Sequence, residues 1–374
     1  MCKLAPRKML RPVLACLFLP LGAFASSPSV MLNAAHPSVR AVAAVQAQVT
    51  ANWMLQPEVL GTAVTLDNSG ATALLVYVDR DSPKAVEVVR SLPEQIQGIG
   101  VQIRLTEKFR AMRHRHRHHH RRHRRARIVR TVGHKFFQIP PIQLGTSGGW
   151  SKDETNNFCC AGTLGALVQI GAQQYILSNW HVLEDDIVPG ANGVVATTGD
   201  AVIQPGLIDV NCSAADAQIV ATLEKRDSLP NSNVDCAIAQ VNPGMVRTDG
   251  AILEIGTISS QTAPAFINQA VKKSGRTTGL TRNVVIGLNA TIRVDYDNEC
   301  DGHFAFSKVF TGQIMVGSRS GQFLDDGDSG SLLVEDVATN PRAIGLLFAG
   351  GSTDAIANPI DEVLSFLGAT MVGN

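Results

Sequence analysis

Apolar residues in the first third of the chain recur at two spacings, which predict a small α/β domain. Residues 37–53 repeat apolar side chains at roughly helical intervals, and a second helix is expected to begin at Ser82-Pro83, a cap followed by a first-turn proline. Residues 72–78 and 100–105 are short apolar runs of strand length. We therefore expect a β-α-β unit. Because it contains no catalytic constellation, we interpret it as a pro-domain or a folding aid.

The remainder of the chain has a different pattern, in which short apolar runs are separated by turns. The sequence is rich in Gly, Val, Ile and Thr and only 5% aromatic, which favours many short strands over long helices. A length of 374 residues fits two or three domains, and a hydrophobic content of 45% is sufficient for a packed core. We predict a mainly β protein in which the small α/β domain, about residues 36–108, precedes a β part at residues 140–374.

The first 25 residues resemble a secretory signal peptide. They combine four basic residues, an apolar stretch from Pro12 to Gly22 and the small-residue site Ala23-Phe24-Ala25. We expect cleavage after Ala25 and a secreted or periplasmic protein. A retained membrane anchor and a lipoprotein site at Cys16 are the alternatives. No other run is apolar for long enough to cross a membrane.

The net charge of +1 conceals a strong division of charge along the chain. Without the four basic residues of the signal and the nine arginines of residues 110–127, 20 of the 33 basic residues remain against 32 acidic ones. The run Arg113–Arg125 consists only of arginines and six histidines. Like charges repel and resist burial, so residues 109–139 are expected to form an extended linker. Alternatives are a processing site, a polyanion-binding segment and a site that collects transition metals.

Three separated segments carry candidate catalytic residues. Gly327-Asp328-Ser329-Gly330-Ser331 lies in a glycine-rich turn before an apolar run, where a serine hydroxyl is expected to be exposed. His181 follows an apolar run and a small polar patch, and Asp235 opens an alternating strand, 54 residues after His181 and 94 before Ser329. Histidine can take the proton of the weakly nucleophilic serine, and a carboxylate can hold the imidazole in one tautomer. The order His, Asp, Ser therefore predicts a catalytic triad, with Asp185 or Asp209 as alternative carboxylates.

These segments, together with Cys160-Ala161-Gly162-Thr163-Leu164, resemble the trypsin-like serine peptidases of the chymotrypsin fold. The resemblance covers about residues 140–370 and is closest to bacterial members with an extra N-terminal domain, a group similar to the plant narrow-leaf protein. It implies two six-stranded antiparallel β-barrels, at about 140–245 and 246–374, with the catalytic residues between them. It also implies an oxyanion hole formed by the N–H groups of Gly327 and Ser329. The strand that contains Phe348, Ala349 and Gly350 would pair with the substrate backbone.

The sequence departs from that family in three places. Val182, rather than cysteine, follows the candidate histidine, so the disulfide usual there is absent or differently partnered. The usual Ile-Val-Gly-Gly activation site is missing, although cleavage after Arg127 would expose an Ile-Val terminus able to pair with Asp328. Phe323, near the family's specificity pocket, is not acidic, which disfavours strict cleavage after Arg or Lys.

Five cysteines remain after removal of the signal: Cys159, Cys160, Cys212, Cys236 and Cys300. Export permits disulfides, and an odd number leaves at least one free thiol. Adjacent Cys159 and Cys160 are not expected to bond each other, and the pairing stays open. No Cys-x-x-Cys spacing is present, so we expect no metal site and no cofactor.

We predict an exported serine endopeptidase that acts on protein or peptide substrates through an acyl-enzyme. Two other classes remain open. One is a non-catalytic binding or scaffolding module on a peptidase fold, and the other is a surface protein that contacts polyanions through Arg113–Arg125.

Overall fold

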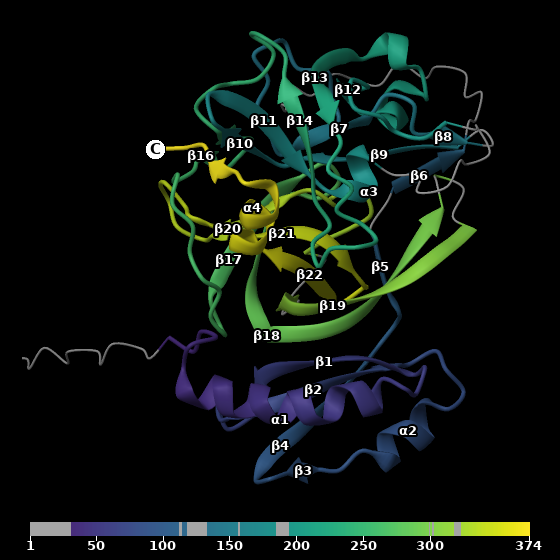
Figure 1. Cartoon of the computed structure of the whole chain (residues 1–374), viewed down its shortest axis with the longest axis vertical. Coiled ribbons are helices and arrows are strands. Elements are labelled where there is room, and N and C mark those ends of the chain that lie inside the picture. The colour runs from purple at the N-terminus through teal and green to yellow at the C-terminus, as the bar shows by residue number, and fades with distance from the viewer. Residues whose placement is uncertain are drawn as a thin grey trace, which may run out of the picture. The chain divides into compact units, whose positions relative to one another are not determined.

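The computed structural model describes residues 31–111, 114–117, 133–155, 158–184, 194–298, 300, 303–317 and 323–374. Strands dominate the chain, which is mainly β as expected (Figure 1). All the elements described below belong to one compact unit, Leu32–Asn374. No helix in these described ranges is long and apolar enough to span a bilayer. The expected signal peptide lies outside the described residues.

The N-terminal part contains the predicted β-α-β unit and two strands that the sequence pattern did not reveal. Its elements are α1 (Pro37–Trp53), β1 (Val59–Leu66), β2 (Thr72–Asp79), α2 (Ala85–Ser91), β3 (Gln95–Ile96) and β4 (Ile99–Thr106). β2 and β4 are parallel and joined through α2. The two strands that were not predicted, β1 and β3, pair antiparallel with β2 and β4 respectively. Helix α1 begins where the His36 imidazole accepts a hydrogen bond from the Ser38 N–H, as an N-cap side chain does.

The first β-rich part is a single antiparallel sheet, and its hydrophobic core also includes residues of the second β-rich part. Its strands are β7 (Thr146–Trp150), β8 (Glu154–Thr155), β9 (Phe158–Leu164), β10 (Ala166–Ile170), β11 (Gln173–Ser178), β12 (Ala201–Gln204), β13 (Gln218–Glu224), β14 (Ala237–Val241) and β23 (Thr370–Met371). The short helix α3 (Trp180–Leu183) and the 3-10 turns η1 (Leu207–Val210) and η2 (Ala214–Asp216) lie in its connections. Residues of β10, β11 and β14, among them Leu167, Ile176 and Ile238, belong to one buried hydrophobic cluster.

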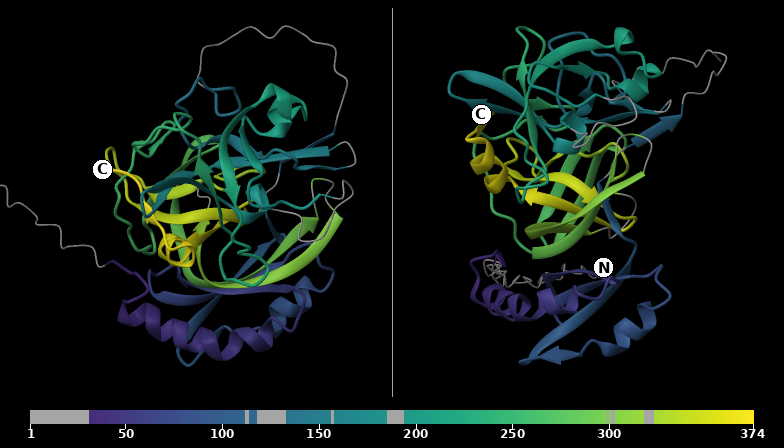
Figure 2. Two further views of the ribbon diagram at one scale, coloured as in Figure 1. Left: turned by 45° about the horizontal axis from the view of Figure 1, so that its top comes forward. Right: turned by 45° about the vertical axis from the view of Figure 1, so that its right-hand side comes forward.

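The second β-rich part is a closed ring of six antiparallel strands. Its members are β17 (Ala270–Gly275), β18 (Gly279–Asn298), β19 (His303–Gly317), β20 (Leu332–Glu335), β21 (Ala343–Gly350) and β22 (Asp354–Pro359). They run in the order β17-β20-β21-β22-β19-β18, and the additional pairing of β17 with β18 closes the ring. β18 and β19 continue beyond it as a long two-stranded ribbon (Figures 1 and 2). A small hairpin of β15 (Ala251–Ile252) and β16 (Gly256–Thr257) precedes the barrel, and α4 (Ile360–Leu367) follows it.

The N-terminal part does not stand apart from the second barrel. β1 pairs antiparallel with β18, so the two share one continuous sheet. The Gln46 amide on α1 reinforces this junction, because it donates to the Asn289 carbonyl at 2.8 Å and its oxygen accepts from the Asn289 amide at 3.0 Å. The sequence pattern identified the unit but not this fusion, because nothing local to either strand specifies a partner more than 200 residues away.

Two disulfides join the described cysteines. Cys159 bonds Cys212, and Cys160 bonds Cys300, while Cys236 is free and buried. The adjacent cysteines therefore point to different partners, as expected, and one thiol remains free. Cys160 connects β9 of the first sheet to the end of the β18–β19 ribbon.

Candidate active site

His181 and Asp235 meet because the strands that lead to them are paired. β11 and β14 are neighbours, with Ser178 opposite Ala237. His181 lies three residues beyond Ser178, in α3, and Asp235 lies two residues before Ala237. The imidazole Nδ1 is 2.6 Å from Asp235 Oδ2, and both side chains are buried. The structure thus brings together two of the three predicted catalytic residues.

The Asp235 carboxylate accepts hydrogen bonds from both β-rich parts. The Trp180 N–H donates to Oδ1 at 2.8 Å, and the Tyr296 hydroxyl, from β18, donates to Oδ2 at 2.8 Å. An ionised carboxylate can only accept, so Nδ1 of His181 must carry the proton that is shared with it. In the neutral imidazole, Nε2 is then left as the acceptor, which is the tautomer that a general base needs.

Ser329 is hydrogen-bonded to both β-rich parts. Its carbonyl oxygen accepts from the Thr163 N–H of β9 at 2.8 Å, and its hydroxyl donates to the Phe348 carbonyl of β21 at 3.2 Å. The next residue, Gly330, has φ +91°, and a Cβ there would lie 2.3 Å from Ser178 Oγ. Only glycine therefore allows the loop to approach β11 so closely.

The link between Ser329 and His181 is not a hydrogen bond in this structure. The serine hydroxyl is hydrogen-bonded to Phe348, and the buried His181 Nε2 has no hydrogen-bond partner in the part of the chain that the structure describes. The segments that carry His181 and Ser329 nevertheless both lie close to Gly162. A Cβ atom placed on Gly162 would be 2.5 Å from Val182 Cγ2 and 3.2 Å from the Ser329 carbonyl oxygen. The expectation of an exposed hydroxyl is wrong, because Ser329 is 0% exposed.

The predicted oxyanion-hole residues lie in a loop of special backbone geometry. Gly327 has φ +92°, and its carbonyl accepts from Thr163 Oγ1 at 2.9 Å. None of the described residues accepts a hydrogen bond from the N–H of Gly327 or of Ser329. Both donors therefore stand unused beside the serine, as an oxyanion site requires.

Asp328 anchors this loop to the core of the second barrel. Its carboxylate accepts from Lys273 Nζ at 3.0 Å and also from the N–H groups of Thr277, Thr278 and Asp325 and from the Thr278 hydroxyl. Lys273 and Asp328 side chains are both 0% exposed. Burial lowers the pKa of the Lys273 ammonium, and the Asp328 carboxylate opposes that shift. In the folded chain Lys273 is thus the cation that faces Asp328. The alternative of an Ile-Val terminus, formed by cleavage after Arg127, concerns residues outside the described ranges and stays a prediction.

The alternative carboxylates do not serve His181 in the part of the chain that is described. Asp209 forms a two-point ion pair with Arg276, both N···O distances being 2.7 Å, and also accepts from Ser147 Oγ at 2.6 Å. Asp185 lies outside the described residues.

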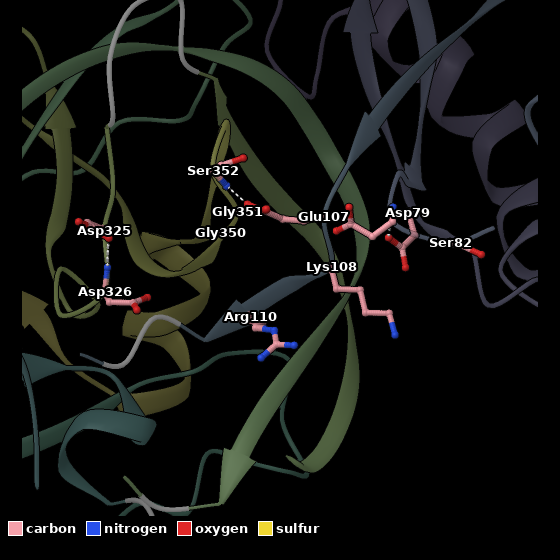
Figure 3. A pocket seen from close by; sticks show the side chains of 11 residues that line it. Asp79, Ser82, Glu107, Lys108, Arg110, Asp325, Asp326, Gly350, Gly351 and Ser352 are labelled. Atoms are coloured by element: carbon pink, nitrogen blue, oxygen red, sulfur yellow. Dashed lines mark hydrogen bonds between the residues drawn. The ribbon is translucent and has the colours of Figure 1, made fainter. Parts of the chain in front are cut away.

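The predicted substrate-binding residues lie on β21 beside a cavity of about 790 Å³ (Figure 3). Phe348 and Ala349 are fully buried, and Gly350 lies at the cavity wall. The lining is rich in carboxylates, with two cations among them: Asp79, Asp81, Glu107, Lys108, Arg110, Asp325 and Asp326. Phe323 is instead packed in a hydrophobic cluster with Leu324 and Leu333 and does not line this cavity.

One group of metal-ligand side chains lies close together within the described ranges. It consists of Asp153, Cys160 and Cys300. The two sulfur atoms are joined in a disulfide, so they offer no thiolate to an ion.

Comparisons with known proteins find similarity to part of the chain. A protein-family profile described as the Nal1 C-terminal domain matches residues 231–357, which include Asp235 and Ser329 but not His181. A solved glutamic acid-specific serine protease, described as using a histidine triad in substrate binding, is 20% identical and covers 62% of this chain and 100% of its own, with a TM-score of 0.39. Thermobifida fusca protease A is 18% identical over 62% of this chain and 99% of its own, with a TM-score of 0.40. A search of curated proteins gives no match.

Two residues of the site were missed by sequence reasoning. Tyr296 donates to Asp235, and Lys273 neutralises Asp328. Tyr296 sits in an ordinary alternating strand and carries no local signal. Lys273 did carry one, because it shares a strand face with Val271, and a lysine on the apolar face of a strand indicates a buried partner.

Replacing Lys273 by Met should destabilise the fold by about 3–5 kcal/mol, because it leaves the Asp328 carboxylate buried without a cation. The measurement is the free energy of unfolding in denaturant at pH 7. The double variant Lys273→Met/Asp328→Asn is the control, and it should recover much of the loss because no unpaired charge remains. Equal stability of Lys273→Met and the parent would contradict this account of the loop.

Glu184, which ends α3, should make stability fall as the pH rises. Burial raises the pKa of its carboxyl from the ordinary 4.5 to about 7, although the Arg226 and Asp227 N–H groups donate to it at 2.8 and 2.9 Å. A raised pKa in the fold means that the stabilisation is complete below about pH 4.5 and is lost as the pH rises through 7. The loss should be about 3 kcal/mol. Glu184→Gln should flatten this part of a stability–pH profile, and the same substitution at the exposed Glu94 is the matched control. A profile that is unchanged by Glu184→Gln would refute the assignment.

Proposed function

We propose that the protein is an exported serine endopeptidase with Ser329 as nucleophile, His181 as general base and acid, and Asp235 as the carboxylate that orients the imidazole. The observation that carries this proposal is the buried His181–Asp235 pair, whose remaining nitrogen, Nε2, has no hydrogen-bond partner among the described residues. A buried nitrogen without a hydrogen bond is costly. The free-energy cost of the unpartnered Nε2 is explained if this nitrogen binds a serine hydroxyl or a substrate-derived proton during turnover.

The reaction begins with rotation of the Ser329 side chain from the Phe348 carbonyl to Nε2 of His181. The hydroxyl oxygen attacks the scissile carbonyl carbon while its proton passes to Nε2. The N–H groups of Gly327 and Ser329 stabilise the resulting oxyanion. Collapse breaks the C–N bond, and the imidazolium delivers its proton to the leaving amine. Water, deprotonated by the same nitrogen, then releases the acyl group and restores the serine.

Export is proposed on the sequence of residues 1–25, and it agrees with the two disulfides in the described part of the chain, which form and persist in oxidising compartments. No cofactor takes part in the proposed steps. The binding-module alternative has one observation in its favour, which is the hydroxyl of Ser329 directed to Phe348 instead of His181. Polyanion contact through Arg113–Arg125 concerns residues that, apart from the backbone of 114–117, lie outside the described ranges.

Ser329→Ala should lower peptide hydrolysis by about four to six orders of magnitude, because the remaining groups supply only binding and oxyanion stabilisation. Asp235→Asn should cost about four orders while the fold is retained. The measurements are kcat/KM for an unstructured protein substrate and labelling by a fluorophosphonate, mapped by mass spectrometry. The neighbouring Ser331→Ala is the control for serine chemistry elsewhere in the loop. A chain that never labels at Ser329, in any processed form, would favour the binding module.

Tyr296→Phe should lower kcat/KM by about tenfold, since a hydroxyl that donates to a buried carboxylate is lost. With one donor fewer, Asp235 attracts the imidazolium more strongly, so the acidic limb of the pH–rate profile should move to higher pH. Phe306→Leu disturbs the ring that stacks on Tyr296 at 4.8 Å between centroids without touching Asp235. If neither variant shifts the pH–rate profile, the Tyr296 hydroxyl has no part in positioning Asp235, and the side chain contributes only packing.

A further inference from the structure

We propose that the chain inhibits itself, because its segment Phe109–Ala111 (β5) occupies the edge of β21 along which an extended substrate would bind. The inference rests on the proposed peptidase function. Phe109–Ala111 lies at the start of the segment 109–139 that the sequence predicts to be an extended linker.

The pairing of β5 is the kind that a bound peptide makes. It runs antiparallel to β21, with Ala111 opposite Ala349 and Arg110 opposite Gly350. Extended peptides commonly bind proteins by adding an antiparallel strand to an exposed sheet edge, where main-chain hydrogen bonds supply much of the affinity. Two of the three residues predicted to bind substrate are therefore already paired.

The segment is also held from its other side. β5 runs parallel to β18, with Phe109 opposite Val294 and Arg110 opposite Asp295. It is inserted between two strands of the second barrel instead of resting on one. A substrate backbone cannot reach this edge of β21 until the inserted strand leaves.

One side chain of β5 and one just before it hold the strand in position. The Phe109 ring is 0% exposed and meets Tyr77 edge to face, with 5.3 Å between ring centroids. The Glu107 carboxylate accepts from the Ser352 N–H just beyond β21 and pairs with Arg80 at 2.9 Å. Figure 3 shows Glu107 beside Gly351 and Ser352. The register of β5 on β21 is thereby set by an apolar anchor and a polar one.

The chain continues from β5 toward the first β-rich part and pairs there too. The backbone of β6 (His114–Arg117) is antiparallel to β9, with Arg115 opposite Cys160. Ser329 is bonded to both of these flanking strands, to β9 through its carbonyl and to β21 through its hydroxyl. The two strands that flank Ser329, β21 and β9, are thus paired with β5 and β6 of the same chain.

Burial of the catalytic residues agrees with occupation of the site. Ser329, His181 and Asp235 are 0%, 1% and 0% exposed. A hydrolase acting on proteins must expose its nucleophile to substrate. The folded full chain is therefore a low-activity form, and release of β5 from β21 is the step that raises activity.

The first test measures access to β21 without requiring catalysis. All variants carry Ser329→Ala, and the probe is a fluorescein-labelled synthetic peptide with the sequence of residues 106–117, followed by anisotropy. Arg110→Pro removes a backbone donor and fixes φ, so it should weaken β5 pairing. It should tighten peptide binding by about tenfold or more, since binding is reduced by the fraction of chains that are closed. Arg110→Ala, which keeps the backbone donor, is the matched control, and a scrambled peptide corrects for charge. Equal affinities for Arg110→Pro and Arg110→Ala would overturn self-inhibition.

The second test uses chains with Ser329 intact and separates the two proposals. Arg110→Pro should hydrolyse an unstructured protein about tenfold or more faster than Arg110→Ala, and the added 106–117 peptide should slow it competitively. Phe109→Ala, which removes the anchor without a proline, should act in the same direction, with thermal unfolding as the check on its fold. Full activity in the unmodified chain would overturn self-inhibition and leave the peptidase in place. Tighter peptide binding with no hydrolysis by any variant would sustain occupation of β21 and remove the peptidase function.

Discussion

A buried negative charge at Asp235 is the constraint on which the rest of the site depends. A carboxylate removed from water is tolerated only if donors surround it. Here the donors are the Trp180 N–H and the His181 imidazole, both in α3, and the Tyr296 hydroxyl of β18, so they come from both β-rich parts. The need to satisfy one charge therefore fixes how the first sheet meets the second barrel. It also selects the imidazole tautomer that leaves Nε2 available.

A second buried carboxylate, Asp328, holds the serine loop in place, as Asp235 holds the His181 imidazole. Asp328 draws the loop inward through Lys273 and three backbone N–H groups. Its neighbours Gly327 and Gly330 supply the positive φ angles that the resulting tight turn needs. An internal lysine therefore supplies the cation that this buried carboxylate needs in the folded chain.

Control of access is what the N-terminal part contributes. β1 extends the sheet of the second barrel and β5 enters between β18 and β21. The N-terminal part is thus anchored at one point and inserted at another. The β1–β18 junction keeps β5 close to its site at a high effective concentration, so weak strand pairing suffices for effective occupation.

Local patterns in the sequence determined much of this protein. Helix α1, the β-α-β order and the strand-rich remainder follow from the spacing of apolar residues, which reflects contacts between near neighbours in the chain. His181, Asp235 and Ser329 could be predicted as a catalytic set because each stands in a recognisable local context and their order is informative. The partners of Cys160 and Lys273, the strand β1 and the insertion of β5 had no such signature. Each depends on contacts between residues far apart in sequence, and those contacts exist only once both sheets have closed around their cores. The candidate catalytic residues could thus be predicted from local sequence. The tertiary structure alone decided which of them are paired, buried and covered.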